Sequence, residues 1–180
     1  MQIIGDEAFY KCSSLEEIIL TESISFIGKQ AFKECSLLKR ADFSLSNIME
    51  LPYECFAHCY KLNEISLPDS LMKINDRCFF KCKKLSSLFF NEGLKVIEDV
   101  FLGCDSLKSL YIPNSLIHME SLRYIKNLKQ IQISSKQKER FIDCFPLDVK
   151  FETIELVNGC LFNPDALIKC QSSHQIICVP

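Results

Sequence analysis

Cysteines are the residues of this sequence with the most evident chemical potential. Two C-x-x-x-C pairs, Cys55 with Cys59 and Cys78 with Cys82, lie 23 residues apart, and four thiolates can hold a tetrahedral zinc ion. A phenylalanine follows the first cysteine of each pair, which is typical of a packed interior, where a thiol behaves as a small hydrophobic side chain. We therefore expect no metal and no cofactor, and keep a cysteine-based metal-binding module as an alternative.

Catalytic chemistry has less support. The three histidines, His58, His118 and His174, have no acidic and nucleophilic partners at a recognisable spacing. The sequence contains no G-x-S-x-G, H-E-x-x-H or glycine-rich phosphate-loop motif, and its five glycines are scattered. The sequence predicts a protein that is not an enzyme.

Composition argues against two further classes. The chain has 21 basic and 23 acidic side chains and a formal net charge of -2, whereas nucleic-acid binding needs a basic surface. No apolar run approaches the roughly 18 residues that cross a bilayer, and Asp6 and Glu7 stand where a signal peptide is basic or apolar. We expect no nucleic acid and no membrane insertion. The small cluster Lys81, Lys83 and Lys84 fits a solvated face or an acidic partner.

The cysteines belong to a repeat that runs through most of the chain. Four columns recur at intervals of 22 to 24 residues: Ile4, Ile27, Leu51, Ile74 and Ile97; Phe9, Phe32, Phe56, Phe79 and Phe101; Cys12, Cys35, Cys59, Cys82 and Cys104; Leu15, Leu38, Leu62, Leu85 and Leu107. An eroded sixth unit follows from Met119. Units this short cannot bury their own apolar side chains, so they must stack in a solenoid.

Each unit changes its hydrophobic period halfway. The first half spaces its apolar residues at helical or 3₁₀ intervals, and the second half, L-x-x-[apolar]-x-[apolar], alternates as a strand. The predicted fold is an α/β repeat solenoid of about six coils. It has a ladder of short parallel strands on one face, about 24 Å long, and short helical or 3₁₀ turns on the other.

The repeat resembles a known family. Units such as Ile27-Gly28-x-x-Ala31-Phe32-x-x-Cys35-x-x-Leu38 and Leu62-x-x-Ile65-x-Leu67 are similar to BspA-like leucine-rich repeats, which occur in bacterial and protozoan surface proteins. The resemblance covers residues 4 to about 133. It implies a leucine-rich-repeat solenoid, and more loosely adhesion or protein binding at a cell surface. Unit five departs from the pattern because it has one residue fewer between Ile97 and Phe101, and we expect a local kink there.

The repeat also explains most of the thiols. Five of the 11 cysteines occupy the cysteine column, and Cys55 and Cys78 take the place that Ala8 and Ala31 have in other units. We expect the thiols of this column to be reduced and buried. Cys35, Cys59 and Cys82 are the residues at which this expectation can be checked. Four cysteines lie outside the repeats, where three disulfide pairings or free thiols are open: Cys144, Cys160, Cys170 and Cys178.

The two ends are expected to differ. We divide the chain into a solenoid, residues 1–133, and a C-terminal cap, residues 134–180, with a helix over 134–145, a strand over Val149–Leu156 and a helical turn from Asn163. The sequence opens inside a repeat at Ile4, which suggests the C-terminal part of a longer array or a truncated product. An uncovered first coil would fray or associate with a second copy.

The strand alternation identifies the residues that face away from the core. The outward column is Ile19, Asp42, Ser66, Phe89, Tyr111 and Gln132, flanked by Glu17, Arg40, Glu64, Ser87, Ser109 and Gln130. Exposed aromatic residues with polar neighbours are typical interface anchors. The face therefore predicts a binding or adhesion scaffold for a protein partner. The alternatives are an architectural spacer in a longer surface protein and an aromatic pair that merely stabilises the ladder.

Overall fold

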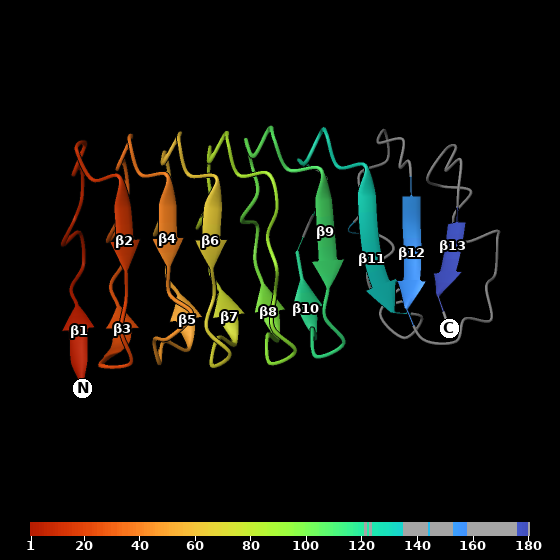
Figure 1. The fold of residues 1–180 in the computed structure, drawn as a ribbon, viewed down its shortest axis with the longest axis horizontal. Helices are drawn as coiled ribbons and strands as arrows, with labels where there is room; N and C mark the ends of the chain where they lie inside the picture. Colours follow the sequence, from red (N-terminus) through yellow and green to blue (C-terminus); the bar gives the residue numbers. More distant parts are fainter. Residues whose placement is uncertain (121, 123, 135–143, 145–152, 158–175, 180) are drawn as a thin grey trace.

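A computed structural model describes residues 1–120, 122, 124–134, 144, 153–157 and 176–179. The chain winds into a solenoid in which every strand pairing is parallel (Figure 1). Most coils contribute one strand to a first ladder and one strand, separated from it by a turn, to a second. The solenoid with units of about 23 residues, predicted from the columns, is confirmed.

The first ladder consists of two sheets of paired strands. One contains β2 (Glu17–Ile19), β4 (Arg40–Asp42) and β6 (Glu64–Ser66), and the other contains β9 (Ser109–Ile112), β11 (Gln130–Ser134), β12 (Thr153–Val157) and β13 (Ile176–Val179). The register joins equivalent residues, so that Ala41 lies between Ile18 and Ile65. This pairing is what the repeated L-x-x-[apolar]-x-[apolar] pattern predicts.

The expected continuous ladder is interrupted at unit four, which is a correction to the prediction. Residues 87–90 keep the inside and outside alternation, since Leu88 and Phe90 are buried and Phe89 is exposed, but they form no strand. The Phe79 and Phe101 rings lie 6.4 Å apart, against 5.2 to 5.9 Å for the earlier neighbours of the column. The interruption is confined to the first ladder, because β7 (Lys73–Ile74) and β8 (Val96–Ile97) of the same two coils are paired in the second.

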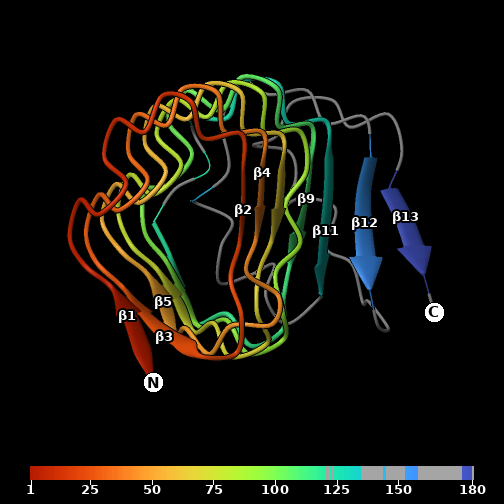
Figure 2. The ribbon, with the colours of Figure 1, turned by 60° about the vertical axis from the view of Figure 1, so that its left-hand side comes forward.

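The second ladder was not predicted. It pairs β1 (Gln2–Ile4) with β3 (Ile24–Ile27), and β5 (Glu50–Leu51), β7 (Lys73–Ile74), β8 (Val96–Ile97) and β10 (His118–Met119) with one another. The residues of the second ladder that point into the core are those of the first column of the repeat, which begins with Ile4 and Ile27. Figure 2 shows the two ladders on different sides of the coil. Strands of two to four residues are too short to show an alternation that a sequence could reveal.

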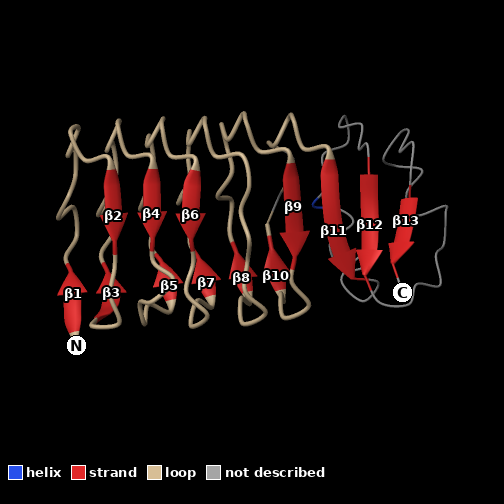
Figure 3. Cartoon of the chain, in the orientation of Figure 1, coloured by secondary structure: helices blue, strands red, loops and turns tan. Residues whose placement is uncertain are grey.

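The turns between the second and first ladders are not confirmed as helical or 3₁₀ elements, and Figure 3 draws them as loops. In the first four coils two turn residues, four positions apart, have left-handed backbone, for example Glu7 with φ 56° and Lys11 with φ 58°. Their N–H groups donate to the next coil, to the carbonyls of Lys29 and Lys33 at 2.9 Å each, and the Phe9 N–H between them donates to the Ala31 carbonyl at 2.8 Å. The N–H groups of the alternate residues, such as Ala8 and Tyr10, donate within the coil to the third residue before them. This division of hydrogen bonds between coils prevents a regular helix.

The residue missing from unit five changes the backbone conformation of its turn. The left-handed positions of unit four are Arg77 and Lys81. In unit five the second position is filled by Gly103 with φ 81°, and Val100, which follows the Asp99 carbonyl that accepts from Arg77, is outside the left-handed region. The shortened unit has therefore lost its first left-handed residue, which is the local kink predicted from the sequence.

The core is a stack of phenylalanine rings. Phe9, Phe32, Phe56 and Phe79 follow one another with ring centroids 5.2, 5.4 and 5.9 Å apart and interplanar angles of 7 to 10°. Phe32, Phe56 and Phe79 are fully buried, and Phe9 in the first coil is partly buried. Offset stacking of this kind adds to the free energy of burial.

The expectations for residues 134–180 fall mostly outside the described residues. Ser134 ends β11, and the expected strand over Val149–Leu156 is present as β12 (Thr153–Val157). Strands β12 and β13 continue the first ladder. The rest of the expected helix, apart from Cys144, and the helical turn from Asn163 are not among the described residues. The division at residue 133 stays a prediction. Within the described ranges, no helix has the length and hydropathy to span a membrane.

Candidate protein-binding surface

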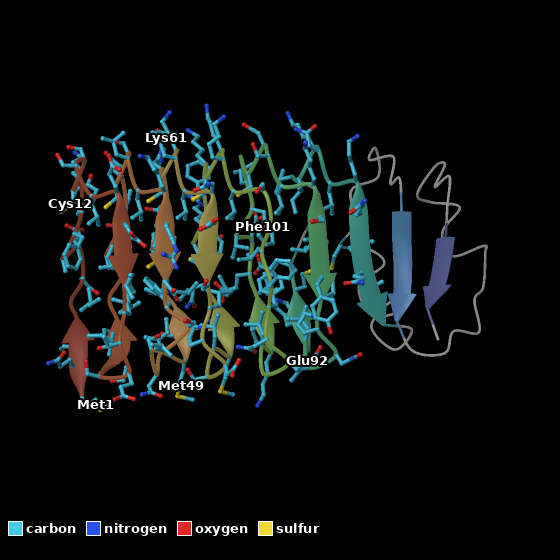
Figure 4. The ribbon with its side chains drawn as sticks, viewed as in Figure 1. Met1, Cys12, Met49, Lys61, Glu92 and Phe101 are labelled. Carbon is cyan, nitrogen blue, oxygen red and sulfur yellow. The ribbon has the colours of Figure 1, made fainter. Side chains whose placement is uncertain are left out.

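The residues predicted to face outward do so, in register. Ile19, Asp42 and Ser66 are aligned across β2, β4 and β6, and Tyr111 is aligned with Gln132 across β9 and β11. The flanking column aligns Glu17, Arg40 and Glu64, and then Ser109 and Gln130. Figure 4 shows side chains projecting along this ladder. We call this surface the strand face.

The strand face begins with a charged stretch on β2, β4 and β6, centred on Arg40. The Arg40 guanidinium lies 2.6 Å from Glu17, 3.2 Å from Asp42 and 3.7 Å from Glu64. Hydrogen bonds from Ser44, and then the Arg40 charge, lower the pKa of the Asp42 carboxyl below its usual value. Because these groups are largely exposed, each pair contributes only weakly to stability. One guanidinium is shared by three carboxylates, so the stretch keeps a net negative charge.

The strand face continues as an uncharged stretch made of Ser87, Phe89, Ser109, Tyr111, Gln130 and Gln132. The Phe89 side chain is 76% exposed. The Tyr111 side chain is half-buried, and its hydroxyl donates to Oε1 of Glu92, whose Oε2 accepts the Asn114 N–H at 3.0 Å. Burial, followed by the Glu92 carboxylate, raises the pKa of Tyr111 to about 12. Tyr111 is thus held in place, and Phe89 projects beside it.

A second apolar surface was missed by the sequence interpretation. On the second ladder or next to it, Ile3, Phe26, Met49 and Ile117 are large apolar side chains exposed to solvent, and Ile3 pairs directly with Phe26 across β1 and β3. Met49 is labelled at the lower edge of Figure 4. The signal was hidden because each of these residues precedes or neighbours a buried apolar residue in the chain, so no polar and apolar alternation marked the strands.

The cysteine column is explained by a hydrogen bond that sequence analysis did not foresee. The Sγ atoms of Cys35, Cys59 and Cys82 each lie 3.1 Å from a phenylalanine carbonyl in the preceding coil, and Cys104 repeats the contact at 3.2 Å. Only a protonated thiol can donate this bond. Burial raises the pKa of Cys59 and Cys82 well above the usual range and that of Cys104 to about 12.

The thiols of Cys59, Cys82 and Cys104 are therefore poorly suited to bind a metal as thiolates. The eight cysteines among the described residues are free, as expected for the column. No group of three or more candidate metal ligands is found in the described part of the chain. The side chains of Cys160, Cys170 and Cys178 are outside it, so the pairing of the C-terminal cysteines stays open.

Comparisons with known proteins agree with this architecture. The sequence pattern described as BspA type leucine rich repeat region matches six copies over residues 1–99 and 49–174. No curated protein sequence matches this one. A leucine-rich repeat protein of T. pallidum, TpLRR, is similar at 24% identity with a TM-score of 0.64, over 88% of this chain and 68% of that one.

Two further solved structures have the same fold. A leucine-rich repeat protein from Eubacterium ventriosum is 27% identical with a TM-score of 0.58, over 63% of this chain and 31% of that one. One from Bacteroides ovatus is 19% identical with a TM-score of 0.62, over 99% of this chain and 52% of that one. The chain thus spans about a third and about half of these two proteins.

Proposed function

This chain belongs to the BspA-type leucine-rich repeat family, and we propose that it is a non-enzymatic scaffold that binds another protein through its strand face. Such families are commonly protein-binding. The observation that carries the proposal is Phe89, a phenylalanine that is 76% exposed among the polar or tethered side chains of the uncharged stretch. Large aromatic residues that lose their exposure on binding are typical energetic centres of interfaces.

The arrangement of the neighbours supports Phe89 as the anchor. Ser87 and Ser109 on its flank are small, so a partner can approach the ring. Tyr111 loses little freedom on binding because its hydroxyl is already bonded to Glu92, and preorganised side chains cost less entropy at an interface. The charged stretch around Arg40 lies two coils away and would orient a charged partner rather than anchor it.

Co-purification with three immobilised forms of the full chain tests this proposal. These are the unaltered protein, a Phe89→Ala, Tyr111→Ala double variant, and an Ile117→Ala control that removes an exposed apolar side chain from the second ladder. We expect a partner captured by the unaltered protein to be retained by the control and lost by the double variant. Equal capture by all three forms would contradict the proposal and would favour the architectural spacer.

Thermal denaturation of the three forms provides the necessary control for folding. All three substitutions are at exposed or half-buried positions, where truncation changes the free energy of unfolding by about 0.5 kcal/mol. Loss of capture by a double variant that melts normally assigns the effect to the face itself.

A further inference from the structure

The turn side of coils three and four carries an unusual concentration of lysines and aromatic rings. We call it the lysine-aromatic patch and define it by Tyr60, Lys61, Phe80, Lys81, Lys83 and Lys84. It precedes β6 and the corresponding segment of unit four, so it borders the strand face without being part of it. Lys61 is labelled at the upper edge of Figure 4.

The rings hold the patch together across the two coils. His58 lies behind it, with its Nδ1 atom 2.8 Å from the Tyr60 hydroxyl and its ring edge-on to Phe80 at 5.1 Å. Nζ of Lys81 is 4.9 Å from the Phe80 ring centroid, and Nζ of Lys83 is 5.9 Å from that of Tyr60. The two lysines are thus placed by cation–π contacts.

The described residues do not compensate the positive charges of the patch. Elsewhere on the coils, lysines pair with carboxylates, as Lys33 does with Glu54 at 2.6 Å and Lys73 with Glu98 at 2.7 Å. Among the described residues, no carboxylate lies within 4.0 Å of the ammonium groups of Lys61, Lys81, Lys83 or Lys84. Burial, and then the charge of Lys81, lowers the pKa of His58, which agrees with a local excess of positive charge.

The area of positive charge extends over only a short distance along the stack of coils. In the column of His58 and Lys81 the equivalent residue of coil two is Glu34, and in the column of Tyr60 and Lys83 the equivalent residue of coil five is Asp105. The patch therefore spans two coils, about 10 Å, with a carboxylate on each side. A long polyanion would run onto these carboxylates, whereas an acidic segment of a few residues fits between them.

We propose that the lysine-aromatic patch binds a short acidic peptide segment of a partner protein. Its aspartate or glutamate side chains pair with the four lysines, and its aliphatic parts lie on Tyr60 and Phe80. Because the patch lies outside the strand face, this contact is additional to binding at that face and is retained when Phe89 and Tyr111 are replaced.

Fluorescence anisotropy of the full chain with labelled hexaglutamate tests the proposal, with labelled hexaglutamine as the neutral control peptide. We expect binding of hexaglutamate only, weakened at about 1 M salt, where the Debye length is about 3 Å. A Lys83→Glu, Lys84→Glu variant should bind about tenfold more weakly. A Lys29→Glu, Lys95→Glu variant makes the same change in net charge at exposed lysines next to β3 and β8 and should bind normally.

The proposal fails under three results. No binding of hexaglutamate at low salt would remove it, and equal losses in the two charge-reversed variants would reduce it to a net-charge effect. Tighter binding of a sulfated polysaccharide or an oligonucleotide, abolished by the same Lys83 and Lys84 changes, would assign the patch to another class of macromolecule.

A Tyr60→Ala variant, in which all charges remain, should lose part of the affinity for hexaglutamate. Melting curves of each variant confirm that the solenoid is intact.

Discussion

The two stretches of the strand face have the same backbone and different surfaces. The charged stretch on β2, β4 and β6 forms ion pairs within itself and keeps a net negative charge, since one guanidinium contacts three carboxylates. The uncharged stretch that begins in unit four exposes a phenylalanine that no side chain covers. The inward residues of both stretches remain apolar. The comparison shows that core packing requires an apolar residue at every second position of each strand segment. The outward residues between them can differ from coil to coil, and they set the chemistry of the face.

The largest expected effect tests whether both stretches rest on one core. Phe56 lies beneath the charged stretch and Phe101 beneath the uncharged one, and both are fully buried in the same ring stack. Replacing either residue by alanine should lower the free energy of unfolding by about 3 to 5 kcal/mol. Denaturant unfolding measures this, and an unchanged midpoint for Phe56→Ala would refute the column assignment.

A second test compares the thiols beneath the two stretches. Cys59 and Cys104 are buried S–H donors, so a thiol reagent should reach them only after the solenoid opens. Their modification in the native protein should be at least about a hundredfold slower than in denaturant. Mass spectrometry of labelled peptides provides the rates, with partly buried Cys12 as the internal reference. Rapid native labelling of Cys59 would contradict its assigned place.

A smaller effect distinguishes the charged stretch. An Arg40→Ala variant leaves Glu17, Asp42 and Glu64 without their shared cation, which should cost about 0.5 to 1 kcal/mol at low salt. Screening should remove most of this loss at about 1 M salt. A Ser87→Ala variant in the uncharged stretch is the matched control and should show no salt-dependent loss. The same loss for Arg40→Ala at both salt concentrations would indicate a packing role instead.

The smallest effect concerns Tyr111 in the uncharged stretch. Its pKa is raised to about 12 from an ordinary value of 10.0, so the folded state resists its ionisation. The resulting contribution to stability is present below pH 10 and is lost as the pH rises toward 12. Ultraviolet titration should show one tyrosine ionising later than the others, and Glu92→Gln should bring it closer to them. Simultaneous ionisation of all tyrosines would exclude the contact with Glu92.

Sequence analysis succeeded wherever one residue type recurred in one column. The phenylalanine stack and the strand register follow from such columns, because stacked coils must place equivalent residues side by side. The columns gave no sign of the second ladder, since Ile3 and Ile4, or Phe26 and Ile27, are both apolar although only one of each pair is buried. The break at unit four keeps the inside and outside alternation, so no single column reveals it.

The candidate surfaces divide in the same way. The outward direction of Phe89 follows from alternation alone. The bond from Tyr111 to Glu92 joins residues 19 positions apart and has no counterpart in the other units, so periodicity could not predict it. The lysine-aromatic patch was visible only as three lysines close in sequence; its rings and the absence of nearby carboxylates emerge when coils three and four are placed side by side.

The hydrogen bonds of the cysteine column affect how the number of coils in the solenoid can change. Each cysteine donates to the coil before it, and the phenylalanine of its own coil accepts from the coil after it. A whole unit inserted or removed in the middle of the array therefore adds or subtracts one donor together with one acceptor. No buried polar group is left without a hydrogen-bond partner. Duplication of a unit is then nearly neutral for the core, so the number of coils can change while each buried thiol keeps its acceptor.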